Sequence, residues 1–371
     1  MAFKLGRHNI EIMRSIGLFV KKKMDATSVE ERVTDFCGME IHINLWNVRT
    51  GGGSDFYAID FGLKYSKDVD FLKLVFPFEA KMEDFSDLAH VLTNNKSLLC
   101  TVFNADMNIS SEQSDSIHDV VNIDSGEKMS IYELSGRNLE WKEFDPESNC
   151  TELKITPHYK KESIKENNVY VRFRIRLHDI NMFAHTRKLS NDLIQSAFSS
   201  TRLFDIRLND KREIDKKLIE GVLYDGFQMV KIEKMHFFYM ADAEETLENG
   251  SNISLDTRML EKERWNPYLE ETEMSAEYLA YHWKLKRKDN GESLYSTFSV
   301  FFKTNYTSYD IKRILKYTMI VILLSFFGSL FVRMFDWFDK DFYFSIGIIS
   351  LFTFGVYCWI LKSNYEGSSR S

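Results

Sequence analysis

Two long stretches without a charged side chain fill most of the last 60 residues of this 371-residue chain. The first, residues 317–332, reaches about 20 residues when its apolar neighbours are included, and the second, residues 342–361, has a similar length. A helix needs about 20 apolar residues to cross the ~30 Å hydrocarbon core of a bilayer. The pattern predicts a transmembrane two-helix hairpin within residues 311–371, with a buried hairpin of a water-soluble protein as the alternative.

The charges around these stretches predict the orientation of the hairpin. The turn between them, residues 333–341, contains three aspartates, whereas lysine and arginine predominate on the two outer flanks. Because basic flanks stay on the cytoplasmic side, both termini and the large part of the chain are expected in the cytoplasm. This places the protein in the cell inner membrane with two spans. The first 24 residues hold no apolar run long enough for a secretory signal.

Polar side chains follow one face of the first predicted span. Thr318, Ser325, Ser329 and Arg333 are spaced 7, 4 and 4 residues apart, and Ile322 fills the gap in this stripe. Polar groups within a membrane helix face protein or water rather than lipid. Two interpretations stay open: a pore, with Ile322 as its apolar constriction, or an anchor whose stripe packs against the second helix. Since two helices cannot enclose a pore, conduction would require a homo-oligomer.

Most of residues 36–305 alternate between apolar and polar side chains and are rich in Phe, Tyr, Val and Ile. That period of two is typical of strands with one buried face. The expected strands span 39–48, 56–65, 71–78, 97–103, 129–134, 169–178, 203–208, 229–239, 277–286 and 295–303. The expected helices are fewer and span 27–36, 84–92, 191–198 and 211–223.

These elements predict an α+β protein with a β-rich cytoplasmic region of two lobes, built mainly from antiparallel sheet. A polar stretch around residues 149–168 is the expected boundary between the lobes. The predicted domains are an amphipathic helical segment at 1–36, lobe 1 at 37–160, lobe 2 with a basic face at 161–310, and the hairpin with a short cytoplasmic tail at 311–371.

The chain is acidic overall, with a net charge of -7, but it contains a basic island. Residues 160–217 hold 14 basic and 8 acidic side chains, a local net charge of +6. Within the island, alternation along 169–178 predicts a strand face that carries Tyr170, Arg172, Arg174, Arg176 and His178. A guanidinium group binds phosphate with two parallel hydrogen bonds, and it stacks on bases.

The strand face predicts a surface for an anionic ligand, and further cations of the island are candidates to complete it: Arg187, Lys188, Arg202, Arg207, Lys211 and Arg212. The alternative is a solvated face whose arginines pair with acids on neighbouring strands. A second strand, 281–288, places His282, Lys284, Lys286 and Lys288 on one face and is a weaker candidate of the same kind.

Motifs of catalysis and metal binding are missing from the sequence. The glycines at 51–53 lack the GK[ST] ending of a phosphate-binding loop, and neither HExxH nor GxSxG occurs. The four cysteines form no CxxC pair. We therefore expect no enzyme activity, no cofactor and no metal site.

A β-rich cytoplasmic sensor joined to a short two-helix hairpin resembles the membrane effectors of bacterial nucleotide-signalled antiphage defence, and among them most resembles the effector of the Hailong system. The resemblance covers the layout of the chain and carries over no residues. It implies a channel kept closed by DNA oligomers that a partner nucleotidyltransferase makes.

The sequence thus predicts a membrane-anchored oligomeric effector that binds a nucleotide or short single-stranded DNA, which controls a pore. The alternative is a membrane-tethered protein-interaction scaffold without channel activity.

Overall fold

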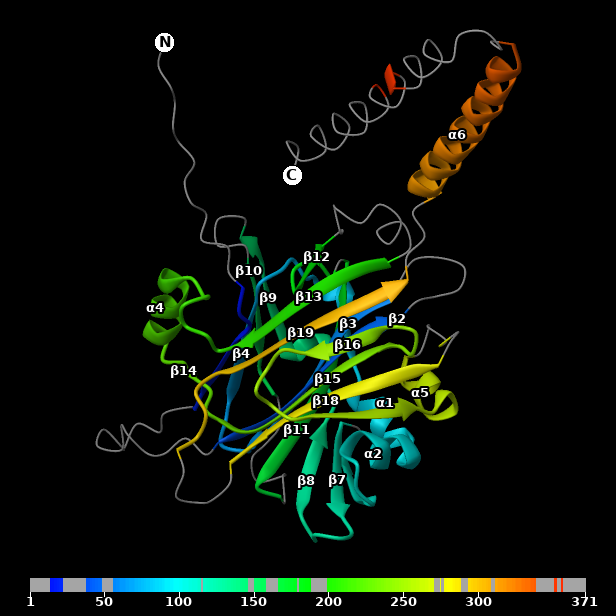
Figure 1. Cartoon of the computed structure of the whole chain (residues 1–371). Helices are drawn as coiled ribbons and strands as arrows, with labels where there is room; N and C mark the ends of the chain where they lie inside the picture. The colour runs from blue at the N-terminus through cyan, green and yellow to red at the C-terminus, as the bar shows by residue number, and fades with distance from the viewer. Residues whose placement is uncertain are drawn as a thin grey trace, which may run out of the picture. The chain divides into compact units, whose positions relative to one another are not determined.

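The computed structural model describes residues 14–22, 38–48, 56–114, 116–145, 150–157, 166–178, 180–187, 199–269, 274, 277–287, 293–307, 311–337, 350, 351 and 355. The chain divides into two compact units, shown in Figure 1. The first comprises residues 1–190 and 200–307, and the second comprises 191–199 and 308–371. Each unit is described by itself.

The first unit is built around a ten-stranded sheet, here called the main sheet. Neighbouring strands pair antiparallel, apart from the parallel pairs β15–β2 and β11–β8. Its strands, from one edge to the other, are β17 (Leu255–Leu260), β18 (Tyr278–Lys286), β15 (Ile232–Asp242), β2 (Met39–Val48), β3 (Phe56–Ser66), β11 (Asn168–Leu177), β8 (Lys128–Tyr132), β7 (Ile117–Asn122) and β6 (Met107–Ser114), with the short β5 (Phe85–Asp87) paired to β11.

Two smaller antiparallel sheets complete the strands of this unit. The five-stranded sheet has the order β14 (Gln228–Met229), β1 (Gly17–Lys21), β4 (Phe71–Phe76), β10 (Cys150–Ile155) and β9 (Leu139–Asp145). The four-stranded sheet has the order β12 (Ala184–Arg187), β13 (Ser199–Leu208), β19 (Phe298–Thr307) and β16 (Thr246–Asn249). The helices are η1 (Met82–Asp84), α1 (Ala89–Asn94), α2 (Lys96–Phe103), η2 (Gly136–Asn138), α4 (Lys216–Tyr224) and α5 (Lys262–Leu269).

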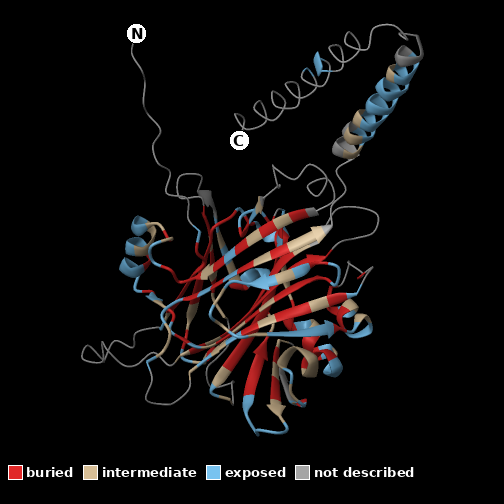
Figure 2. Cartoon of the chain, in the orientation of Figure 1, coloured by how far each residue is buried: buried red, intermediate tan, exposed pale blue. Residues whose placement is uncertain are grey.

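The two faces of the main sheet bury two different apolar clusters, because successive side chains of a strand point to opposite sides. On β2, the odd-numbered Ile41, Ile43 and Leu45 belong to the larger cluster, which the main sheet shares with the smaller sheets. The even-numbered Trp46 belongs to a second cluster with residues of α1, α2 and α5. These three helices thus cover part of the even-numbered face (Figure 1), and buried residues follow the strands (Figure 2).

The predicted β-rich character is confirmed, and strand β2 lies at the residues where the alternation places it. One predicted strand, 97–103, is wrong, because α2 occupies these residues. The Asn95 side chain accepts a hydrogen bond from the Leu98 N–H and so caps the start of the helix. Asn104 ends it in the left-handed conformation, with φ 49°. The predicted helices at 27–36 and 191–198 lie outside the described residues.

The expected amphipathic helix near the N-terminus differs from the structure, since Gly17–Lys21 forms strand β1. Leu18 and Val20 pack into the larger cluster, whereas Phe19 packs into a third cluster beside α4. A strand that is buried on both faces reads as a continuous apolar run, and such a run resembles a helical stripe in sequence. The predicted boundary between two lobes falls inside one sheet. Strand β3 precedes this boundary in the chain and β11 follows it, yet the two strands pair with each other over ten residues.

The described part of the second unit is dominated by α6 (Ile311–Trp337). The first predicted span, residues 317–332, lies within this helix, and the second, residues 342–361, lies outside the described residues apart from 350, 351 and 355. Within the described ranges, the structure contains no helix whose length and apolar character suffice to span a membrane. The predicted transmembrane hairpin, the two-span inner-membrane location and the ion channel are therefore wrong.

Candidate functional site

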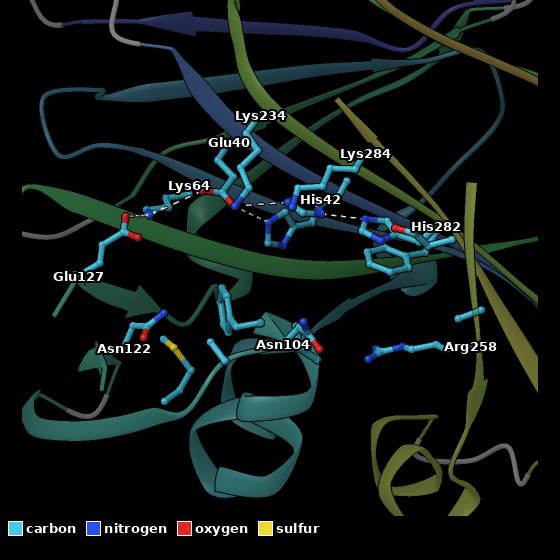
Figure 3. A pocket seen from close by; sticks show the side chains of 18 of the residues that line it. Glu40, His42, Lys64, Asn104, Asn122, Glu127, Lys234, Arg258, His282 and Lys284 are labelled. Carbon is cyan, nitrogen blue, oxygen red and sulfur yellow. Dashed lines mark hydrogen bonds and ion pairs between the residues drawn. The ribbon is translucent and has the colours of Figure 1, made fainter. Parts of the chain in front are cut away.

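A pocket of about 410 Å³ lies on the even-numbered face of the main sheet, beside the part covered by helices. Strands β2, β3, β15, β17 and β18 form its floor, and the end of α2 with β6–β8 forms the facing wall. We call it the central pocket (Figure 3). Its charged and polar lining residues are Glu40, His42, Lys64, Asn104, Asn122, Glu127, Lys234, His236, Asp256, Thr257, Arg258, His282 and Lys284.

Strand register explains why these side chains meet. Glu40 and His42 lie two residues apart on β2 and so share a face. On the neighbouring strands, Lys64 pairs with Glu40, and His236 pairs with His42. One strand further, Lys284 pairs with His236. The pocket floor thus consists of even-numbered positions on adjacent strands.

Glu40 is the centre of the charge network on this floor. Its Oε1 atom lies 2.7 Å from Lys234 Nζ and 3.0 Å from His42 Nε2, and its Oε2 atom lies 3.7 Å from Lys64 Nζ. Burial alone would raise the pKa of the Glu40 carboxyl, but the hydrogen bonds and positive neighbours outweigh it and hold the pKa well below its usual range. Lys64 also pairs with Glu127. Figure 3 shows both lysines directed at Glu40.

Three histidines form a row next to Glu40. Burial lowers the pKa of His42, that of His236 to about 2 and that of His282 to about 4, and nearby positive charges add to the effect on each ring. All three imidazoles are therefore neutral near pH 7. Nδ1 of His236 lies 2.9 Å from Nε2 of His282, so one of these two nitrogens donates to the other.

Aromatic rings continue this row across the pocket. The His282 ring stacks on Phe238 with centroids 4.1 Å apart and on His236 with centroids 5.1 Å apart. On the facing wall, Phe103 lies at the end of α2, with its ring centroid 6.0 Å from that of His42. The pocket therefore offers π faces as well as charge.

Two cations, Arg258 and Lys284, lie at the His282 end of the pocket, and the charge of Glu261 acts on Arg258 without forming an ion pair with it. Within the described part of the chain, neither Arg258 nor Lys284 forms an ion pair or a hydrogen bond, and both side chains are exposed. Their positive charges are among the causes that lower the pKa of His282, which places them near its ring. In Figure 3 the Arg258 side chain points into the space between the strands and α2.

The arginines of the predicted anion-binding face occupy the same even-numbered face, but α5 covers them. Arg174 donates to both carboxylate oxygens of Asp60, from Nε at 2.7 Å and from Nη2 at 3.1 Å. Arg172 donates from Nε to the Tyr268 hydroxyl at 2.6 Å and from Nη1 to the Tyr170 hydroxyl at 2.9 Å. Both guanidinium groups and Tyr170 are buried, so no ligand reaches them in this structure.

The other predicted ligand-binding residues do not converge on one place. Arg176 and His178 are exposed at the end of β11, where His178 lies 3.4 Å from Asp84. Arg207 belongs to β13 and pairs with Asp205 and Glu213 at 2.6 and 2.9 Å.

The remaining members of the predicted set are also dispersed. Arg202, on β13 of the four-stranded sheet, is buried and its guanidinium carbon lies 4.4 Å from the Tyr306 ring centroid. Arg187 ends β12, and only its backbone is described. Lys188 lies outside the described residues.

The predicted polar stripe lies on α6, and its hydroxyls bond along their own helix. Thr318 Oγ1 donates to the Ile314 carbonyl at 2.9 Å, and Ser329 Oγ donates to the Ser325 carbonyl at 3.0 Å. The stripe residues Ile322, Ser325 and Arg333 are exposed. The predicted packing of this stripe against the second helix stays a prediction.

Sequence analysis identified part of the central pocket, since His282 and Lys284 belong to the weaker of the two basic strand faces that it predicted. It missed Glu40, His42 and His236, which carry the same signal of polar side chains at every second position of a strand. No metal site was expected, yet the ligand atoms of Glu40, His42 and His236 all lie within 4.8 Å of one another. No family model and no curated protein matches the sequence.

Proposed function

We propose that the first unit is a binding module for an anionic ligand of the nucleotide class, which it holds in the central pocket. The observation that carries the proposal is the combination of Arg258 and Lys284, two cations that form no ion pair with any described residue, with the stacked rings of Phe238 and His282. A nucleotide joins the two complementary groups, a phosphate and an aromatic base, in one small molecule.

The chemistry of the lining supports each half of such a ligand. Arginine and lysine form charge-assisted hydrogen bonds with phosphate oxygens. Aromatic side chains stack on bases, and each base contributes ~1–3 kcal/mol. Neutral imidazoles and the amides of Asn104 and Asn122 offer donors and acceptors for the edge of a base.

The size of the pocket favours a short ligand. A volume of about 410 Å³ falls in the range of small-molecule sites, which enclose most of a ligand rather than track an extended strand. We therefore propose a mononucleotide or a short oligonucleotide that inserts one nucleotide here, in place of the arginine face on β11. Homo-oligomerisation, a partner nucleotidyltransferase, a role in antiphage defence and the lack of enzyme activity stay predictions.

The test is a titration of the full chain with nucleoside monophosphates and with fluorescently labelled short single-stranded DNA. Arg258→Ala and Lys284→Ala should each weaken binding about tenfold or more, since each removes a charged hydrogen bond. The matched control is Arg212→Ala, because this arginine is also exposed but pairs with Asp210 outside the central pocket.

The outcomes separate binding to the pocket from general attraction of anions. The parent should bind a nucleoside without phosphate more weakly than the corresponding monophosphate. The affinity for the nucleoside should be the same in the parent and in Lys284→Ala, since Lys284 would contact only the phosphate. If Arg212→Ala weakens binding as much as the pocket variants do, or if no nucleotide binds the parent, the proposal is wrong. Analysis of the recovered ligand tests whether the chain converts it.

A further inference from the structure

We propose that Glu40, His42 and His236 bind a divalent transition metal ion, with zinc as the first expectation. The proposal is independent of the nucleotide proposal, because its three ligands include neither of the cations, Arg258 and Lys284, that would hold the phosphate. His nitrogens and a carboxylate oxygen are the ligands of many zinc sites, and a set of three leaves the fourth position to water or another ligand.

The positions of the three ligand atoms suit one ion. Nε2 of His42 lies 3.0 Å from Glu40 Oε1, and Nε2 of His236 lies 3.9 Å from the same oxygen. Ligand atoms around a tetrahedral zinc, each ~2.0–2.1 Å from the ion, are roughly 3.3 Å apart. Side-chain shifts of about 1 Å would complete the site, with the backbone held by the parallel β2–β15 pair.

The second nitrogen of each histidine is already occupied. Nδ1 of His236 faces Nε2 of His282 at 2.9 Å, and Nδ1 of His42 lies 3.4 Å from the Tyr170 hydroxyl. Histidines that bind metals generally use one ring nitrogen for the ion and the other for a hydrogen bond that fixes the ring. Both Nε2 atoms therefore point toward Glu40 as ligands would, and His282 and Tyr170 act as positioning residues.

His42 is almost wholly buried and His236 partly so, and the open side of the cluster faces the central pocket. The fourth coordination position is thus accessible from the pocket.

Lys234 is the natural competitor of the metal. Its Nζ lies 2.7 Å from the Glu40 oxygen that both histidines approach, so the ion and the ammonium group would share one site. We infer that binding of the ion displaces Lys234 toward the pocket, where it is half-exposed. This competition gives the proposal a variant that should gain affinity rather than lose it.

The experiment measures Co²⁺ by visible absorption and Zn²⁺ by calorimetry on the full chain. The parent should bind one equivalent and show the intense bands of four-coordinate Co²⁺. His236→Gln should weaken binding at least tenfold, and Lys234→Met should strengthen it severalfold. The matched control is His118→Gln, because His118 Nε2 lies 3.0 Å from Glu133 Oε1, the distance of the His42–Glu40 pair, on β7 away from the proposed ligands.

The proposed site is supported if metal affinity falls in His236→Gln, rises in Lys234→Met and is unchanged in His118→Gln. Equal loss in His236→Gln and His118→Gln, a parent that binds no metal, or a Lys234→Met variant with weaker binding overturns it. If His236→Gln fails to fold, Lys234→Met alone decides, because it leaves all three ligands in place. Nucleotide binding without metal binding would refute this proposal and leave the nucleotide proposal intact.

Discussion

The buried ion pair of Asp60 and Arg174 allows a quantitative test of why the arginine face is covered. Asp60 is fully buried and accepts four hydrogen bonds. Two come from Arg174, one from Trp46 Nε1 at 2.6 Å and one from the Tyr268 hydroxyl at 2.8 Å. If this network is structural, its removal lowers the free energy of unfolding and leaves the central pocket intact in the folded protein.

The structure sets the expected magnitude. Because Asp60 and Arg174 are 0% and 4% exposed, either single substitution leaves a buried charge without its partner, which costs about 3–5 kcal/mol. We expect that loss for Asp60→Asn and for Arg174→Met. The double variant removes both charges together, so its loss should fall short of the sum of the single losses by at least ~1.5 kcal/mol.

Urea unfolding followed by circular dichroism measures the four free energies of unfolding. The matched control is the Lys303–Glu248 pair, whose atoms lie 3.0 Å apart but whose side chains are 37% and 62% exposed. Its coupling energy should be at most ~1 kcal/mol. A coupling energy below ~0.5 kcal/mol for Asp60 and Arg174 would refute the reasoning. A double variant that folds but has lost nucleotide binding would also refute the reasoning, since that result would indicate that the arginine face contributes to ligand binding.

Two further predictions concern single residues. Burial raises the pKa of Asp87 to about 7 against the opposing hydrogen bond from the Leu134 N–H, so the folded state keeps a proton that the unfolded chain releases above about pH 4. This contribution to the free energy of unfolding is complete below about pH 4 and is lost as the pH rises to about 7. In urea titrations at about pH 5 and 8, the free energy of unfolding should therefore change less with pH for Asp87→Asn than for the parent. An equal change in both proteins would contradict the prediction. A Cβ added to Gly62 would lie 2.1 Å from the Tyr170 hydroxyl, so Gly62→Ala should lower the free energy of unfolding by about 1–3 kcal/mol in thermal melts. Gly221→Ala, in α4 with nothing within 4 Å, should be neutral or stabilising, and similar losses at both glycines would contradict the steric argument.

Alternation in the sequence predicted much of the main sheet, because local side-chain period decides which residues face a core. The same pattern gave the correct face for Arg172 and Arg174. It did not give their surroundings, since Asp60 lies 114 residues from Arg174 in the chain, and Tyr268, which covers both, follows them by more than 90. Which segment covers a strand face depends on tertiary contacts that a strand pattern does not contain.

The central pocket was harder to predict because its parts are shared among strands that are distant in the sequence. Single polar residues such as His42 and His236 look like the solvated positions of ordinary strands. Their meaning arises from the register that pairs them across the parallel β2–β15 contact. A short apolar run can fit either a strand or a helix. Residues 97–103 were predicted as a strand, but the Asn95 side chain caps helix α2 there.

The parallel pairing of β2 with β15 also bears on when the pocket forms during synthesis. Parallel neighbours cannot be joined by a tight turn, and here about 190 residues separate the two strands, as the contact between Lys234 and Glu40 illustrates. Because contacts of such long sequence separation form slowly and late, a nascent chain displays Glu40 and His42 long before His236 leaves the ribosome. Ligand capture in the pocket would thus report that the chain has been synthesised at least as far as Lys284, the last residue that lines the pocket.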